Sequence, residues 1–259
     1  MNGAVAWMAV LAAVGAALRS TWSPCALSML STITPLTERG RGHRYPATAA
    51  WFVVGGIAGG MTVGAAGAGL AAVARAVHLG GRSGLAAATV LAGLAALCDA
   101  GVFRARPPFL RRQVNEDWLT RYRPWVYGTG FGWQIGTGLT TYIMTTGVIL
   151  TLALAVLTAS PLAAFAVGTL FGLVRGAAVL LSSNLTGPSA LLAFHRRLDA
   201  LASLSRTATV LLLAGLAVAG GALRWGVAGG VLVAAAVAVP IGLTTARRGV
   251  RRTHRLELS

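Results

Sequence analysis

Long apolar runs, separated by short polar segments rich in arginine, make up most of the chain. Runs of about 20 apolar residues are typical of helices that cross a bilayer. The pattern predicts seven spans, at 3–35, 46–73, 84–103, 125–158, 162–182, 207–223 and 226–245. No basic segment precedes the first run, so we expect a retained span and no cleaved signal peptide. The expected fold is an all-α integral membrane protein, with residues 1–259 forming one polytopic domain.

Composition agrees with this fold class. Hydrophobic residues make up 56% of the chain, charged residues make up 11%, and the mean hydropathy is +0.71. Soluble domains carry about a quarter charged residues. The first expected partner is therefore the lipid bilayer.

The distribution of basic residues predicts an orientation. All 22 basic residues are arginines, and the formal net charge is +16. If the N-terminus lies outside, 17 arginines fall in cytoplasmic loops or the C-terminal tail and three in the opposite loops. Cytoplasmic loops carry such an excess in multi-pass proteins. We therefore expect a cell inner (plasma) membrane protein with its C-terminus in the cytoplasm, and no binding to nucleic acid.

The first predicted span is interrupted by the stretch WSPCALSMLSTITP, residues 22–35. Ser23 and Pro24 are typical of a helix start, with a hydroxyl cap followed by proline at the first helical position. Cys25 would then lie in the first turn, where the helix dipole favours an anion and a thiol is more reactive. A small buried cysteine beside a packing kink is the alternative. Pro35 is expected to end this half-helix, and the hydroxyls of Ser28, Ser31, Thr32 and Thr34 would line it.

The fourth predicted span contains a short echo of this stretch. Aligning Trp22 with Trp133 sets WSPCALSMLSTIT beside WQIGTGLTTYIMT and pairs Cys25 with Gly136. Because the two stretches lie three spans apart, they would cross the membrane in opposite directions, as in an inverted repeat with broken helices. Chance is the alternative for so short a match. The expected units are a half-repeat 1–103, a cytoplasmic loop 104–124, a half-repeat 125–223, and an extra span with a basic tail, 224–259.

Charged and polar residues inside spans are functional candidates, because they are costly in a bilayer. Arg175 lies near the centre of the fifth span, with Asp99 as its suggested partner, and Arg19 lies in the first span. Arg175 would favour an anionic solute or a thiolate, or else bond to the carbonyls of broken helices. Candidate cavity-lining residues of the fourth span are Gln134, Gly136, Thr137, Gly138, Thr140 and Thr141.

The SPC motif at 23–25, a proline about ten residues later and the GFGW motif at 130–133 resemble a known family. They look like the transmembrane thiol-disulfide carriers of cytochrome c biogenesis and the membrane domain of the periplasmic disulfide reductase. A related membrane protein of methylamine-utilisation clusters is another candidate relative. The resemblance implies a six-span core of two inverted halves that carries electrons through one cysteine in each half. Its implied partners are a thioredoxin-like protein and a periplasmic thiol protein.

The chain departs from this pattern, because the second motif cysteine is absent and Gly136 stands in its place. A two-electron carrier needs a second thiol to release a mixed disulfide. Cys98 is a candidate for that role, although its depth along the third span differs from that of Cys25 by roughly 7 to 8 Å at 1.5 Å per residue. The four histidines do not form a metal-binding pattern, so we expect neither a metal nor a cofactor.

Three functions remain open from the sequence. The first is membrane thiol-disulfide exchange in support of envelope protein or cytochrome maturation, with Cys25 as the reactive thiol. The second is transport of a small solute, an anion by preference, on the same fold. The third is a non-catalytic membrane subunit of a larger complex. The loop 104–124, with its aromatic residues, would anchor the chain at the interface or receive a cytoplasmic partner. Whether the chain is an enzyme stays open.

Overall fold

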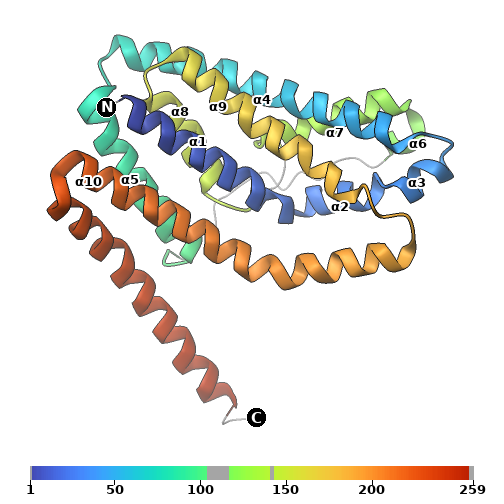
Figure 1. The fold of residues 1–259 in the computed structure, drawn as a ribbon. Coiled ribbons are helices and arrows are strands. Elements are labelled where there is room, and N and C mark those ends of the chain that lie inside the picture. Colours follow the sequence, from blue (N-terminus) through green and yellow to red (C-terminus); the bar gives the residue numbers. More distant parts are fainter. Residues whose placement is uncertain (1, 104–116, 141–142, 257–259) are drawn as a thin grey trace.

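The computed structural model describes residues 2–103, 117–140 and 143–256 (Figure 1). These residues form an elongated helical bundle, and the described part of the chain contains no β-strand. Most of the loop predicted at 104–124 and the candidate Thr141 lie outside the described residues.

The first half of the chain begins with a broken helix. Helix α1 (Asn2–Arg19) continues through the 3-10 turn η1 (Ser20–Trp22) to α2 (Pro24–Thr32). A short helix, α3 (Pro35–Gly40), leads to the long helix α4 (Tyr45–Ala76), and α5 (Gly81–Ala100) completes this half.

The second half of the chain contains helices α6 to α10. A single-turn helix, α6 (Trp118–Arg121), precedes α7 (Pro124–Thr137), and the next helix is α8 (Gly147–Leu157). Helix α9 (Pro161–Ala177) ends in the 3-10 turn η2 (Ala178–Ser182), and α10 (Pro188–Leu256) closes the chain. The ring of Trp118 in α6 stacks on Phe131 of α7, with centroids 5.8 Å apart.

The helices of the structure do not reproduce the seven predicted spans, because fewer of the helical segments that it describes are long enough to cross a membrane. Among the described residues, five helical segments are long and apolar enough to cross a membrane: Asn2–Trp22, Tyr45–Ala76, Gly81–Ala100, Pro161–Ser182 and Pro188–Thr245. The predicted fourth span is divided into α7, of 14 residues, and α8, of 11 residues, and each is shorter than the roughly 20 residues that a span needs. The predicted sixth and seventh spans both lie in α10, where Gly226 has non-helical angles (φ 76°, ψ −173°) and the chain reverses (Figure 1).

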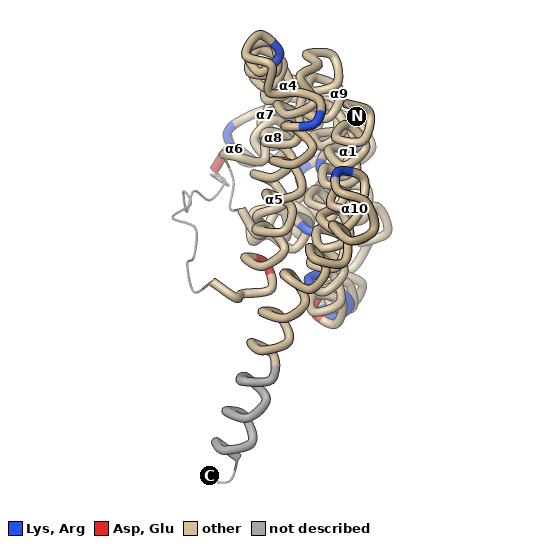
Figure 2. The backbone as a smooth tube through the Cα atoms, turned by 90° about the vertical axis from the view of Figure 1, so that its left-hand side faces the viewer, with Lys and Arg blue, Asp and Glu red and all other residues tan. Residues whose placement is uncertain are grey.

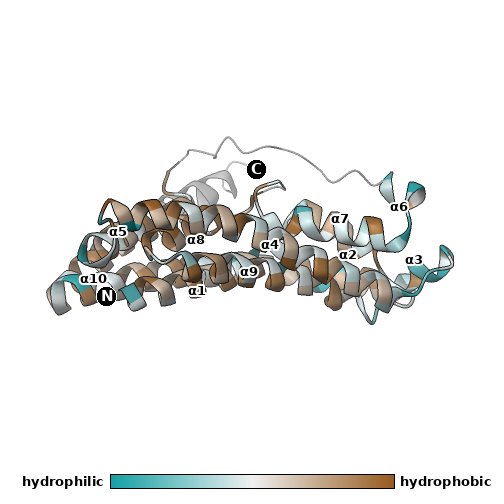
Figure 3. Cartoon of the chain, turned by 90° about the horizontal axis from the view of Figure 1, so that it is seen from above, coloured by the Kyte–Doolittle hydropathy of each residue, from teal (hydrophilic) through white to brown (hydrophobic). Residues whose placement is uncertain are grey.

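Polarity follows the long axis of the bundle. Hydrophobic positions fill the middle, and hydrophilic positions gather at the two ends (Figure 3). Long tracts of helix carry no charge (Figure 2). A bundle with an apolar middle and polar ends suits a lipid bilayer, which is the environment the sequence predicts.

Helix α4 is the centre of the packing, because glycines on two of its faces admit two neighbouring helices. On one face, a methyl group added to Gly56 would lie 2.7 Å from Gly176 Cα of α9, and one added to Gly60 would lie 2.8 Å from Gly172 Cα. The other face meets α7, where Gly136 contacts the backbone of Gly56. Small residues permit such close backbone approach in membrane proteins, and Gly56, Gly60 and Gly64 form a glycine ridge at four-residue spacing along α4.

The remaining core divides into two clusters. One is rich in alanine and joins α1, α5, α8, α9 and α10. The other is rich in aromatic residues and joins α2 to α4 and α7, with Cys25, Phe52, Tyr127 and Phe131 among its buried members. The candidate site lies where α9 borders this second cluster.

Candidate functional site

The start of α2 is built as the sequence predicts. Ser23 is extended (φ −71°, ψ 147°), and its Oγ accepts a hydrogen bond of 3.3 Å from Ala26 N. Pro24 occupies the first helical position, and Cys25 follows in the first turn with only 1% of its surface exposed. The cap therefore separates α2 from α1 and fixes the thiol inside the bundle.

Pro35 has a different role from the predicted one. Helix α2 ends at Thr32, and Pro35 starts the next helix, α3. Thr34 caps α3 by accepting from Thr37 N at 3.1 Å, and the Thr37 side chain bonds back to Thr34 N at 3.0 Å. Helix α2 therefore ends because the extended Thr34 cannot continue it, and the chain then starts the capped helix α3.

Arg175 is a buried charged group that interacts with this thiol. It lies near the end of α9 with 3% of its surface exposed, and its guanidinium interacts electrostatically with Cys25. Its Cζ lies 5.8 Å from the centroid of the Phe171 ring, and its Nη2 atom has no hydrogen-bond partner in the described part of the chain. An arginine stays protonated in proteins, so this buried charge needs an anion or a polar group nearby.

Glycines explain why an arginine can be buried at this position. Gly172 and Gly176 lie on either side of Arg175 in the sequence and contact Gly56 and Gly60 of α4 through backbone atoms. Because α9 and α4 approach closely on that face, no large side chain fits between them there. The guanidinium of Arg175 lies over the ring of Phe171 and interacts electrostatically with Cys25 of α2.

Asp99 does not pair with Arg175 as suggested from the sequence. Its carboxylate accepts hydrogen bonds from Thr145 Oγ1, from Thr146 N at 2.8 Å and from Thr146 Oγ1 at 2.8 Å. It thereby ties the end of α5 to the stretch before α8. Asp99 does not reach Arg175 because it lies in the last turn of α5, and α5 packs mainly on α10 and not on α9.

Arg19 and Cys98 lie near Asp99, apart from the Cys25 cluster. Arg19 Nη1 donates to Ser205 Oγ at 2.8 Å, and its charge interacts with those of Asp99 and Arg206. Cys98 is half-buried on α5, and no disulfide joins it to Cys25. The structure therefore does not bring the two thiols into a bond.

Gly136, aligned with Cys25 in the sequence echo, has no room for a side chain. A methyl group added there would lie 2.8 Å from both the carbonyl carbon and the Cα of Gly56. Helix α7 ends one residue later, and Gly138 closes it in a left-handed conformation (φ 70°). The break in the fourth span thus follows Gly136, whereas the break in the first span precedes Cys25, so the two breaks do not coincide in the alignment.

Most of the predicted cavity-lining hydroxyls bond locally. Thr137 and Thr140 both donate to the carbonyl oxygen of Gln134, at 2.8 Å each, and so cap the end of α7. Thr32 donates to the Ser28 carbonyl oxygen at 2.9 Å within α2. These hydroxyls satisfy helix carbonyls, which is common for serine and threonine in membrane helices.

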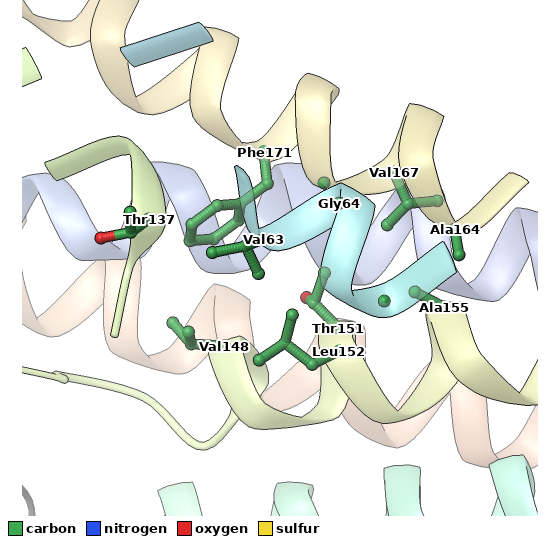
Figure 4. Close-up of a pocket in the computed structure, with 12 residues that line it drawn as sticks. Val63, Gly64, Thr137, Val148, Thr151, Leu152, Ala155, Ala164, Val167 and Phe171 are labelled. Carbon is green, nitrogen blue, oxygen red and sulfur yellow. The ribbon is translucent and has the colours of Figure 1, made fainter. Parts of the chain in front are cut away.

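A small cavity lies between α4, α8 and α9, about 20 Å³ in volume (Figure 4). Figure 4 shows Phe171, Val63, Val148 and Leu152 around it, with Thr137 at one side. Its lining is almost wholly apolar, so it offers few hydrogen-bond partners to a polar solute. We find no group of three or more metal-ligating side chains in the described segments.

Sequence reasoning missed Glu38, which is completely buried. Its carboxylate accepts from Thr48 Oγ1 at 2.6 Å, from the Tyr127 hydroxyl at 2.8 Å and from Arg41 Nη1 at 3.0 Å. These bonds join α3 to α4 and α7 beside the Cys25 cluster. The sequence feature that could have identified it is a single acidic residue, three positions before Arg41, in a loop whose other charged residues are basic.

The similar proteins found by comparison with known proteins share the name MauF. The chain is 33% identical over 175 residues to the methylamine utilization protein MauF of Paracoccus denitrificans, in an alignment that covers 63% of this chain and 59% of the relative. It is 34% identical over 183 residues to MauF of Paracoccus versutus, covering 66% and 63%, and 32% identical over 179 residues to MauF of Methylophilus methylotrophus, covering 64% and 58%. The chain thus spans about three fifths of the length of these relatives.

No family model matches the chain, and no solved structure matches it. The relatives agree with the methylamine-utilisation resemblance seen in the sequence. The resemblance to thiol-disulfide carriers rests on the SPC and GFGW motifs alone.

Proposed function

We propose that this chain performs thiol-disulfide exchange in a membrane, with Cys25 as the reactive thiol, in support of methylamine utilisation. The name of the relatives supports the physiological setting. One observation carries the chemistry: Arg175 and Cys25 are both buried, and the guanidinium interacts electrostatically with the thiol.

Charge balance supports a thiolate at Cys25. The carboxylate of Glu38 is held by three donors, among them Arg41, and that of Asp99 by Thr145 and Thr146. A buried cation without a counter-ion is costly, and a thiolate beside it removes that cost. The same charge activates the sulfur, because the thiolate is the nucleophile in disulfide exchange.

The exchange step needs a partner with a second thiol. The Cys25 thiolate attacks a disulfide of the partner, so that a Cys25–partner disulfide forms while the partner's own disulfide breaks and its second sulfur leaves as a thiolate. A thiolate of another protein then attacks the partner's sulfur in the mixed disulfide, so that a disulfide between that protein and the partner forms and Cys25 leaves as a thiolate. The second thiol comes from outside because position 136 has no room for a side chain. A thioredoxin-like protein or a periplasmic thiol protein fits this role.

Because Cys25 is buried, exchange also requires α2 to open. Ser23 is extended before α2, and Ile33 and Thr34 are non-helical after it. Helix α2 can therefore move without breaking the backbone hydrogen bonds within α1 or α3. This opening is part of the proposal.

We further propose an inverted repeat of residues 1–103 and 125–223, oriented with the N-terminus outside. The packing of α4 on α9 and of α5 on α10 supports it, since each pair joins elements that would be equivalent in the two halves. The arginine distribution supports the orientation.

The proposed exchange is tested by trapping its intermediate. Membranes from cells growing on methylamine are quenched with acid and alkylated, and the chain is separated with and without reductant. We expect a reductant-sensitive adduct with the wild type and with Cys98→Ser, and none with Cys25→Ser. An adduct that survives Cys25→Ser, or growth on methylamine that is unaffected by Cys25→Ser, contradicts the proposal.

The unpartnered Nη2 of Arg175 favours a second candidate, transport of a small anion. The two candidates make opposite predictions in proteoliposomes. Transport requires that Arg175→Ala abolish anion uptake while Cys25→Ser leaves it intact. Absence of Arg175-dependent uptake for chloride, phosphate and acetate excludes this candidate.

A further inference from the structure

Three segments meet at the end of the bundle that carries the N-terminus (Figure 1). They are the start of α1, the turn from α4 to α5 and the turn from α8 to α9. Together they enclose a surface pocket of about 570 Å³, which we call the N-end pocket. Its lining residues are Asn2, Arg75, His78, Gly80, Gly81, Ala159 and Ser160.

Specific contacts hold the three segments together. Gly81 N donates to Asn2 Oδ1 at 2.8 Å, which ties the start of α5 to the start of α1. A methyl group added to Gly80 would lie 2.9 Å from the Cβ of Ala159, so the two turns touch where this glycine stands. The pocket is therefore formed by packed backbone and not by loose side chains.

The N-end pocket is positive. Arg75 and His78 are both exposed, and within the described residues neither side chain forms a hydrogen bond or ion pair with another group. Helices α5 and α9 both begin at the pocket, so the positive ends of two helix dipoles are added to these side chains. No acidic residue is among those that line the pocket.

We propose that the N-end pocket binds a phosphate group, and that the phosphate belongs to a phospholipid head group or to a soluble phosphate. Phosphate oxygens suit the guanidinium of Arg75, and the dipoles of α5 and α9 favour an anion at the same place. The volume exceeds that of a bare ion and accommodates a head group. Apolar side chains border the pocket in sequence and are exposed, Val77 at 57%, Leu79 at 49% and Leu162 at 79%, and they offer a surface for acyl chains.

The test uses the full chain and three variants. Binding of phosphatidylglycerol, of phosphatidylcholine and of inorganic phosphate is measured by native mass spectrometry and titration calorimetry. Arg75→Gln and His78→Gln alter the pocket. Arg82→Gln is the matched control, because Arg82 lies at the same end of the molecule and does not line the pocket.

We expect the Arg75→Gln/His78→Gln double variant to bind about tenfold more weakly, as loss of charge-assisted hydrogen bonds implies, while Arg82→Gln binds like the wild type. Retention of lipid but not of inorganic phosphate identifies the head group as the source of the phosphate, and the reverse identifies a soluble phosphate. Equal losses in the control and the pocket variants, or no binding of any of the three probes, overturn the proposal. Cys25 takes no part, so this test is independent of the proposed thiol chemistry.

Discussion

Substitution of Gly136 by alanine tests whether the second thiol position is closed by packing. The added methyl group would lie 2.8 Å from two backbone atoms of Gly56. Helix α4 cannot retreat, because the opposite face of Gly56 contacts Gly176 of α9. We therefore expect α7 to shift and the buried contacts of its last turns to loosen.

The size of the effect follows from two opposed terms. Overpacking a tight core costs about 1 to 3 kcal/mol, and the upper end applies here because the obstructing atoms are backbone. Alanine in place of glycine in a helix returns about 0.5 to 1 kcal/mol. We expect a net loss of about 2 kcal/mol in the free energy of unfolding.

Gly69 of α4 supplies the matched control, since a methyl group added there meets nothing within 4 Å. Gly69→Ala should leave stability unchanged or raise it slightly. Unfolding in mixed detergent and dodecyl sulfate micelles, followed by far-ultraviolet circular dichroism, measures both variants. Equal stability of Gly136→Ala and Gly69→Ala would refute the argument that position 136 excludes a side chain.

Three further predictions concern the surrounding structure. Ser23→Ala removes the cap of α2 and should cost about 1 kcal/mol of stability, measured by the same unfolding assay, with Ser160→Ala at the cap of α9 as the comparison. Tyr127→Phe deletes one of three hydrogen-bond donors to the buried Glu38 and should lower the free energy of unfolding by about 1 to 3 kcal/mol. Tyr122→Phe, at an exposed tyrosine, is the control. If both variants lose equally little stability, the hydrogen bonds of Glu38 contribute little to stability. Gly226→Ala places a side chain on a residue with positive φ (76°) and should lower the free energy of unfolding by about 1 kcal/mol. We expect the turn between the two parts of α10 to loosen, so that cysteine pairs introduced across it crosslink more slowly. An unchanged crosslinking rate would contradict this prediction.

Local signals in the sequence predicted local structure well. Ser23 and Pro24 identify the start of α2 because capping depends on neighbours along the chain. The glycine ridge of α4 predicts close helix contacts, but not that Gly56 meets both α7 and α9, since partners depend on the tertiary arrangement. The position of the break after Thr137 could not be predicted, because the apolar run 125–158 continues across it.

Charged residues were harder to assign. Arg175 was a candidate because an arginine is rare in a span, yet its neighbour Cys25 comes from a distant segment. Asp99 was suggested as its partner because it is an acid near a span, but its carboxylate bonds to Thr145 and Thr146 instead. The burial of Glu38 depends on how α3 folds back against α4 and α7, which no local pattern in the sequence records.

The central claim is that Arg175 stabilises a reactive thiolate at Cys25. The most direct test is the rate at which a small membrane-permeant maleimide alkylates Cys25 in membranes, in a Cys98→Ser background that leaves one thiol. With Arg82→Gln as control, we predict that Arg175→Gln slows alkylation at neutral pH about tenfold, the effect of roughly 1.4 kcal/mol of lost thiolate stabilisation, and that Arg175→Lys restores much of the rate. An alkylation rate that is the same in Arg175→Gln and in the parent chain contradicts the claim.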